Sequence, residues 1–216
     1  DHFDGKIEFQ NVHFAYDEKQ LVLKGIDFKV NSGETVAIVG ATGAGKSTII
    51  SLITRLYDIN SGKIMLDDVD IRDYELYNLR SHIGVVLQDV FLFHGSIFEN
   101  LTLGDESITL EQIKKAAKDI GVDEFIESLP NGYDYVVSER GSSISLGQRQ
   151  LLSFLRAYLS DPKILILDEA TSSIDHEREK LIQRATEKIT KNRTSILIAH
   201  RLSTIEKADK IIVMDH

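Results

Sequence analysis

The sequence predicts an α/β fold with a mostly parallel sheet, an antiparallel β flank and an inserted α-helical subdomain. In the C-terminal part, strand-like runs alternate with helical segments, as in βαβ units. The run Ile164–Leu167 is apolar throughout, which is typical of a strand buried on both faces of a parallel sheet. Before residue 40, three strand-like stretches follow one another with short connections, which predicts the antiparallel flank.

The N-terminal part is predicted to be rich in strands. Its strand-like stretches lie at residues 6–16, 21–30, 35–39, 63–66 and 83–87. The first of these alternates apolar and polar residues, although the step from Phe9 to Val12 breaks strict period two. Asn31–Glu34 is a turn sequence that leads into the buried third strand. Helices are expected at residues 48–56 and 75–81.

Helices and loops dominate the middle of the chain, from about residue 89 to residue 159. Thr109–Gln112 has the pattern of a capping box, and Gly121 is the expected end of the helix that it starts. A short helix is expected at 122–129, before Pro130, and a longer one at 145–159. We interpret this segment as a helical subdomain inserted into an α/β core.

The core is expected to resume at residue 160. Its remaining elements are strands at 164–167, 195–199 and 211–214, and helices at 177–189 and near 203–207. The chain is thus predicted to form one domain over residues 1–216, with a core of 1–88 and 160–216 and a helical subdomain of about 89–159.

The stretch Gly40–Thr48 fits G-x-x-x-x-G-K-[ST], the phosphate-binding loop, and lies between a predicted strand and a predicted helix. The residues expected to cradle phosphates are Gly40, Thr42, Gly43, Ala44, Gly45, Lys46, Ser47 and Thr48. Glycines let the backbone approach an anion, and the helix start offers free N–H groups and the positive end of its dipole. We expect Lys46 to reach the β- and γ-phosphates and Ser47 to bind Mg²⁺. A glycine-rich turn that matches by chance is the alternative. The sequence therefore predicts a P-loop NTPase core that binds a nucleoside triphosphate.

Two carboxylates, Asp168 and Glu169, follow the apolar run Ile164–Leu167. In parallel sheets, ligands bind at the carboxyl ends of the strands, where this pair emerges. We expect Asp168 to support Mg²⁺ and Glu169 to polarise the attacking water. The alternative is an acidic pair that only caps a helix.

A second anion site is possible at Ser145–Gln148, where a hydroxyl and open N–H groups begin a long helix. Physical reasoning alone favours a plain helix cap there. However, Ile144–Gln148 resembles the L-S-G-G-Q signature of the ATP-binding-cassette (ABC) family, and the phosphate loop and the Asp168–Glu169 pair complete the three defining motifs of that family. The resemblance covers nearly the whole chain and implies that Ser145, Gly147 and Gln148 contact ATP.

The resemblance also assigns roles to residues that would be unremarkable alone. Tyr16 resembles the aromatic residue that stacks on adenine, although a core tyrosine is its plain interpretation. Gln88 resembles the glutamine that touches Mg²⁺ and water, and otherwise would be a surface amide. Asp175 closes a stretch similar to the S-A-L-D loop, for which a helix N-cap is the alternative. His200 resembles the switch histidine at the γ-phosphate, whereas a lone histidine after a strand is usually structural.

Finer features resemble the exporter branch of the family. These are the stretches 91–100, after Gln88, and 138–141, before the signature. The resemblance implies a location at the cytoplasmic face of the cell membrane and a transmembrane domain fused N-terminally to this chain. It also implies a second nucleotide-binding domain, placed head to tail, with ATP and Mg²⁺ between the two. Leu146 departs from the signature by replacing its first glycine, a position that supplies only a backbone N–H group.

The composition of the chain argues against two kinds of function, nucleic-acid binding and thiol chemistry. The net charge of -9 argues against a nucleic-acid partner, and a chain without cysteine has no thiol chemistry. Two alternatives to an exporter ATPase stay open. A soluble cassette ATPase of DNA repair or translation would show a duplicated cassette, a coiled coil or a basic surface. A regulatory nucleotide-binding partner without turnover is disfavoured by intact Glu169 and His200.

Overall fold

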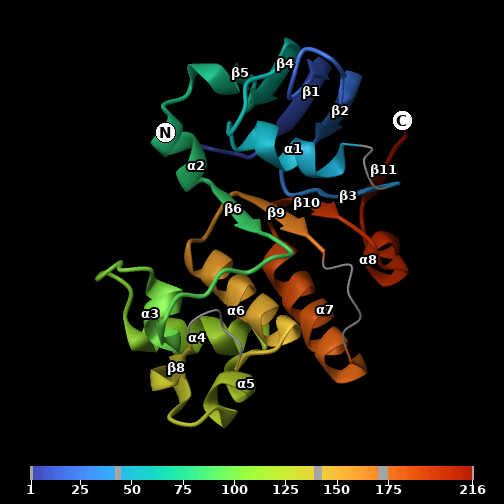
Figure 1. Ribbon diagram of the computed structural model, residues 1–216. Helices are drawn as coiled ribbons and strands as arrows, with labels where there is room; N and C mark the ends of the chain where they lie inside the picture. Colours follow the sequence, from blue (N-terminus) through green and yellow to red (C-terminus); the bar gives the residue numbers. More distant parts are fainter. Residues whose placement is uncertain (1, 42–44, 139–142, 170–174, 216) are drawn as a thin grey trace. The chain divides into compact units, whose positions relative to one another are not determined.

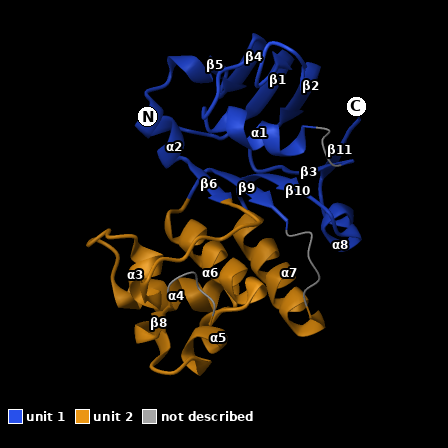
Figure 2. Cartoon of the chain, in the orientation of Figure 1, with its two compact units in different colours: residues 1–85, 162–169, 192–216 blue, residues 86–161, 170–191 orange. Residues whose placement is uncertain are grey.

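The computed structural model describes residues 2–41, 45–138, 143–169 and 175–215. The chain folds as two compact units, which Figure 2 shows in different colours. Unit 1 comprises Asp1–Val85, Pro162–Glu169 and Asn192–His216, and unit 2 comprises Val86–Asp161 and Ala170–Lys191.

Unit 1 contains the predicted antiparallel flank. Its four strands have the order β2-β1-β4-β5 and are β1 (Ile7–Phe14), β2 (Leu23–Val30), β4 (Ser61–Leu66) and β5 (Val69–Asp70). The pairing of β1 shifts register between Phe9 and Val12, and Asn11 has a positive φ of 47°. This bulge keeps both Phe9 and Val12 buried, which explains the broken alternation in the sequence.

Unit 1 also contains a parallel sheet with the order β11-β3-β10-β9-β6 (Figure 1). Its strands are β3 (Thr35–Gly40), β6 (Ile83–Val86), β9 (Ile164–Asp168), β10 (Thr194–Ile198) and β11 (Lys210–Met214). Strand β10 pairs in parallel with both β3 and β9, so that Ile198 lies opposite Ile38 on one side and Asp168 on the other. The carboxyl ends of these three strands therefore meet at one edge of the sheet.

The helices of unit 1 are α1 (Lys46–Ile53), α2 (Leu76–Ser81) and α8 (Leu202–Glu206), with a 3₁₀ turn at Ile71–Asp73. The prediction of 48–56 for the first helix was wrong at both ends. Gly45 starts the helix in a left-handed conformation, and Arg55, with φ 53°, cannot continue it. Apolar residues of α1, including Ile49 and Leu52, are buried in the core between the strands.

Unit 2 is mainly helical. It contains α3 (Ile97–Thr102), α4 (Leu110–Ile120), α5 (Asp123–Ser128), α6 (Leu146–Leu159) and α7 (His176–Thr190), the two-residue strands β7 (Gly95–Ser96) and β8 (Val136–Val137), and a 3₁₀ turn at Gly132–Asp134. The Thr109–Gln112 capping box and the left-handed Gly121 bound α4 as predicted. Helix α7 packs on α6 and α4 in this unit, although the sequence-based range 89–159 leaves it out.

Candidate functional site

Two glycines of the phosphate-loop sequence, Gly40 and Gly45, have conformations and surroundings that favour glycine. Gly40 ends β3 with φ 154°, and a Cβ atom there would lie 2.2 Å from the carbonyl oxygen of Met214 on β11. Gly45 has φ 91°, and its Cβ atom would approach the side chain of Leu23 to 2.8 Å. Both positions therefore exclude a side chain. Thr42, Gly43 and Ala44 lie outside the described residues.

The side chain of Lys46 returns to the end of β3. Lys46 is only 8% exposed, and its ammonium group donates a hydrogen bond to the carbonyl oxygen of Gly40. Within the described residues of α1, the first turn carries no acidic side chain and Gly45 supplies no side-chain cap. A nearly buried cation beside an uncapped helix start fits the binding of a phosphate, because both attract negative charge. The Ser47 side chain is exposed at the same helix start.

Tyr16 lies beside α1 and is 52% exposed, which contradicts its plain interpretation as a core tyrosine. Its hydroxyl oxygen is 2.9 Å from Oγ1 of Thr48. Its ring makes edge contacts with Phe14, at 4.8 Å between centroids, and with Tyr57, at 5.0 Å. An exposed ring held at one edge can offer a face to a nucleobase. Tyr57 could not be predicted as part of the site, since no local sequence pattern places it next to Tyr16.

Asp168 and Glu169 lie at the carboxyl edge of the parallel sheet. Asp168 is half-buried as the last residue of β9, and Glu169 is only 5% exposed. Oε1 of Glu169 accepts hydrogen bonds from the backbone N–H groups of His200, at 3.0 Å, and Arg201, at 2.6 Å. Oε2 of Glu169 accepts a hydrogen bond from the hydroxyl of Thr204. The structure thus joins Glu169 to His200, two residues that the sequence analysis placed in one site, and adds Thr204.

The described site residues contain no group of three or more His, Asp or Glu side chains that could hold a metal ion. In nucleotide sites, Mg²⁺ is bound through one or two carboxylates together with substrate phosphates, and it keeps several waters. The exposed hydroxyl of Ser47 at the start of α1 and the half-buried carboxylate of Asp168 at the end of β9 have the oxygen chemistry that this mode requires.

The remaining predicted residues lie in unit 2. Ser145 is the N-cap of α6, where its hydroxyl accepts from the N–H of Gln148 at 3.2 Å and Oε1 of Gln148 accepts from the N–H of Ser145 at 3.1 Å. Gly147 is buried in the first turn. The cap that physical reasoning favoured is therefore present, and the N–H group of Gln148 in the first turn of α6 forms part of it.

Asp175 and Gln88 also belong to unit 2. Asp175 caps α7 by accepting from the N–H of Arg178 at 3.0 Å, and it forms an ion pair with the Arg178 guanidinium at 3.1 Å. The stretch 172–174 before it lies outside the described residues. Gln88 is half-buried, two residues after β6. The helix-cap alternative for Asp175 is thus also present.

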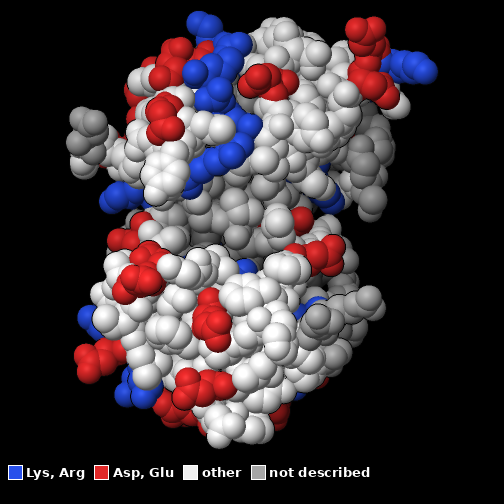
Figure 3. Space-filling model, turned by 60° about the vertical axis from the view of Figure 1, so that its left-hand side comes forward, with Lys and Arg blue, Asp and Glu red and all other residues white. Residues whose placement is uncertain are grey.

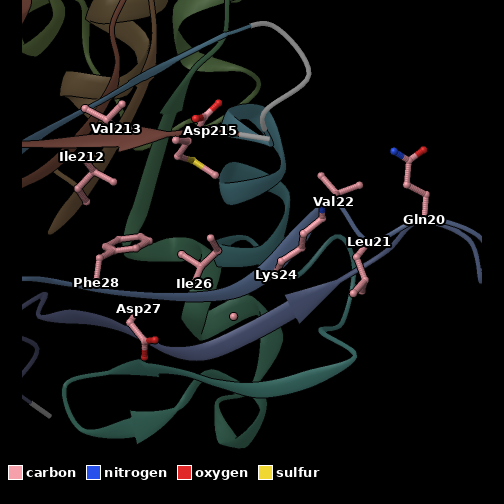
Figure 4. A pocket seen from close by; sticks show the side chains of 12 residues that line it. Gln20, Leu21, Val22, Lys24, Ile26, Asp27, Phe28, Ile212, Val213 and Asp215 are labelled. Atoms are coloured by element: carbon pink, nitrogen blue, oxygen red, sulfur yellow. The ribbon is translucent and has the colours of Figure 1, made fainter.

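A separate groove of about 550 Å³ lies in unit 1 along β2 and β11. Its lining includes the apolar side chains of Ile26, Phe28, Ile212 and Val213 (Figure 4). None of the predicted site residues lines this groove. It is therefore a different feature from the nucleotide site.

The protein-family model described as "ABC transporter" matches residues 23–172. This chain belongs to the ABC transporter family. A relative from Bacillus subtilis, the putative multidrug export ATP-binding/permease protein YgaD, is 52% identical over 100% of this chain and 37% of its own length. The ATP-dependent lipid A-core flippase of Haemophilus influenzae is 52% identical over 98% of this chain and 36% of its own length. The chain therefore spans little more than a third of either relative.

A solved structure, that of a bacterial Atm1-family ABC exporter with ATP bound, superposes with a TM-score of 0.90. Its sequence is 40% identical to this ABC transporter chain, and the match covers 98% of this chain and 37% of that one. The predicted fold class is thereby confirmed, and the fold is that of an ABC nucleotide-binding domain. Among the described residues, we find no helix with the length and apolarity that crossing a membrane requires.

Proposed function

We propose that this chain is the ATP-hydrolysing domain of an exporter, converting ATP and water to ADP and phosphate. The observation that carries the proposal is the edge of the parallel sheet in unit 1. There, a buried lysine at an uncapped helix start and a glutamate bonded to the segment of His200 follow strands whose carboxyl ends meet. This is the edge at which parallel sheets bind ligands.

Binding is assigned to the residues around α1. The backbone between Gly40 and Thr48 surrounds the phosphates, and Lys46 exchanges the carbonyl oxygen of Gly40 for a β- or γ-phosphate oxygen. Tyr16 stacks on the base through its exposed ring. Ser47, Gln88 and Asp168 would hold Mg²⁺, which neutralises charge on the phosphates when it is bound.

Hydrolysis is assigned to Glu169 and His200. Glu169 accepts a proton as the water oxygen bonds to the γ-phosphorus, and the bond from this phosphorus to the bridging oxygen of ADP breaks. His200, whose side chain is exposed at the end of β10, contacts the γ-phosphate. The backbone N–H of His200 donates a hydrogen bond to Glu169. This bond keeps the proposed base close to the residue that contacts the γ-phosphate.

The site is completed by a second nucleotide-binding domain. Ser145, Gly147 and Gln148 at the start of α6 contact the γ-phosphate held by the partner domain, and Asp175 lies at the same interface. The γ-phosphate then acts as a ligand shared by two chains, so ATP binding favours closure and hydrolysis removes that preference. The name of the Bacillus subtilis relative YgaD, which joins ATP-binding to permease, supports a fused transmembrane domain. We place that domain N-terminal to this chain, and the chain itself at the cytoplasmic face of the membrane.

A soluble ABC ATPase of DNA repair or translation is not favoured, because the relatives are named as export and flippase proteins. The charged side chains of unit 1 are consistent with this conclusion, because basic residues there are paired with acidic ones. On the face drawn in Figure 3, Lys and Arg side chains form a strip in the upper part, and Asp and Glu side chains lie beside it. Arg72 forms an ion pair with Asp70 at 2.6 Å, and this pair holds the pKa of the Asp70 carboxyl below its ordinary value. Lys6 pairs with Asp68 at 2.8 Å.

The direct test uses the purified chain, alone and joined to its natural transmembrane domain. We expect release of phosphate from ATP that requires Mg²⁺ and stops with EDTA, and nucleotide-driven pairing by analytical ultracentrifugation. If neither preparation hydrolysed ATP and neither paired in the presence of nucleotide, the proposed function would be excluded.

A further inference from the structure

The start of α8 is capped by Glu169, a residue that follows strand β9. Arg201 occupies the N-cap position of α8, but its side chain makes no capping hydrogen bond. Instead, the carboxylate of Glu169, which follows β9, accepts from the backbone N–H groups of His200 and Arg201. A carboxylate is the preferred partner of such free N–H groups. Glu169 is thereby tied to a segment more than thirty residues away in sequence.

Thr204 is the third donor to this carboxylate. Its hydroxyl lies one turn into α8 and donates to Oε2, while the two backbone N–H groups donate to Oε1. The two carboxylate oxygens thus have different donors, which fixes the plane of the group as well as its position. His200 and Arg201 donate through the backbone, whereas Thr204 donates through its side chain, so a substitution can remove the Thr204 donor.

We propose that Thr204 is a positioning residue for Glu169. This inference rests on the proposed function, in which Glu169 accepts the proton of the attacking water. Glu169 is only 5% exposed, and three donors restrain it to one orientation next to the backbone of His200. Without the hydroxyl of Thr204, Oε2 loses the hydrogen bond that this side chain donates, and rotation of the carboxylate about its bond to Cγ is less restrained. The orientation of the base then varies, and effective proton transfer depends on that orientation.

The test compares Thr204→Val, which keeps the shape and removes the donor, with Thr204→Ser, which keeps the donor. We expect Thr204→Val to lower the kcat of ATP hydrolysis by roughly 10-fold to 100-fold, with KM for ATP changed less than about 2-fold because ground-state binding uses other residues. Thr204→Ser should restore kcat to within about 3-fold of the unmodified chain. A matched control is Thr186→Val, since the hydroxyl of Thr186 donates within its own helix, at 2.8 Å to Ile182 O.

The positioning role also predicts dependence on Glu169. In a Glu169→Gln background, where the base is already absent, Thr204→Val should change the residual rate by less than about 2-fold. An equal loss in both backgrounds would overturn the proposal, as would an unchanged or raised kcat in Thr204→Val. Failure of Thr204→Ser to restore kcat would also overturn it.

A second measurement is independent of turnover. Amide hydrogen exchange at His200 and Arg201, followed by NMR in the folded chain, should accelerate in Glu169→Ala and to a smaller extent in Thr204→Val, and should return toward the original rate in Thr204→Ser. Unaltered exchange in Thr204→Val would refute the coupling of Thr204 to the carboxylate. If exchange responds as expected but the unmodified chain hydrolyses no ATP, the proposed function fails while the hydrogen-bonded arrangement is upheld.

Discussion

The hydroxyl oxygen of Tyr16 lies 2.9 Å from Oγ1 of Thr48, the third residue of α1. This contact links the aromatic residue proposed to stack on the base with the helix whose start is proposed to bind the phosphates. Thr48 is only 4% exposed, so its hydroxyl is a fixed partner for the tyrosine. The two ends of a bound nucleotide are therefore expected to meet one rigid part of unit 1.

Two substitutions of Tyr16 distinguish the contribution of its ring to ATP binding from that of its hydroxyl. Tyr16→Ala should weaken ATP affinity by about 1–3 kcal/mol, the cost of losing one base-stacking ring, with little change in kcat. Tyr16→Phe keeps the ring and should bind ATP within a few-fold of the unmodified chain. Equilibrium binding of a fluorescent ATP analogue measures both. Tyr77→Ala is the control, since Tyr77 is 81% exposed on α2. Equal affinity in Tyr16→Ala would refute stacking.

Glu169→Gln tests the proposed base. The amide keeps the size of the side chain but cannot accept the proton, so hydrolysis should fall roughly 10²–10⁴-fold while ATP binding persists. Phosphate release and binding of radiolabelled ATP report the two effects separately. Glu124→Gln, at an exposed position of α5, controls for the loss of one charge. Turnover that survives Glu169→Gln would remove Glu169 from this role.

Ser145→Arg tests the interface between two domains. In a Glu169→Gln background, which retains ATP, the added guanidinium should block ATP-dependent dimerisation at the start of α6. The substitution also removes a helix cap worth about 0.5–2 kcal/mol. Thr109→Arg is therefore the control, because it removes the equivalent capping box of α4. Size-exclusion chromatography with ATP should show dimers for the control alone. Dimers in both variants would count against the shared site.

Tyr133 tests the packing of unit 2. It is 6% exposed, and its hydroxyl has no hydrogen-bond partner among the described residues. Tyr133→Phe should therefore leave the free energy of unfolding unchanged or raise it by up to about 1 kcal/mol. In contrast, Tyr74→Phe should lower it by about 1 kcal/mol, because the hydroxyl of Tyr74 donates to Leu66 O at 2.9 Å. Denaturant unfolding measures both, and a clear loss of stability in Tyr133→Phe would contradict this account.

The stability of the fold should depend on pH through the same residue, Tyr133. Burial raises the pKa of Tyr133 from 10.0 to about 12, so the native state keeps its proton in a pH range where the unfolded state releases it. Stability should therefore fall as pH rises from 10.0 toward 12. Tyr133→Phe should lose this part of the alkaline decline. An identical decline in both chains would show that other groups cause it.

Local sequence patterns predicted many boundaries correctly. The Thr109–Gln112 capping box and Gly121 act through residues adjacent in the chain, so the ends of α4 could be predicted from four or five letters. The bulge at Asn11 was visible as a broken alternation. The first helix was misplaced because the pattern of apolar residues does not show that Lys46 and Ser47 are already helical.

Other features depend on contacts between distant segments. No pattern in the sequence indicates that Tyr57 packs against Tyr16, or that Thr204 donates to Glu169. The placement of α7 with α6 and α4 is likewise set by packing, since its own sequence predicts only an amphipathic helix.

The sequence by itself determined the fold class, the phosphate-loop pattern and the motifs that identify the family, because each motif depends on residues close together in the chain. It did not show α3 or the two-residue strands β5, β7 and β8. Only the tertiary structure decided that the carboxylate of Glu169 is held by His200 and Arg201, just before α8, and by Thr204 within it. That arrangement requires β9 and β10 to lie side by side in register, and such pairing brings together residues that no local pattern connects.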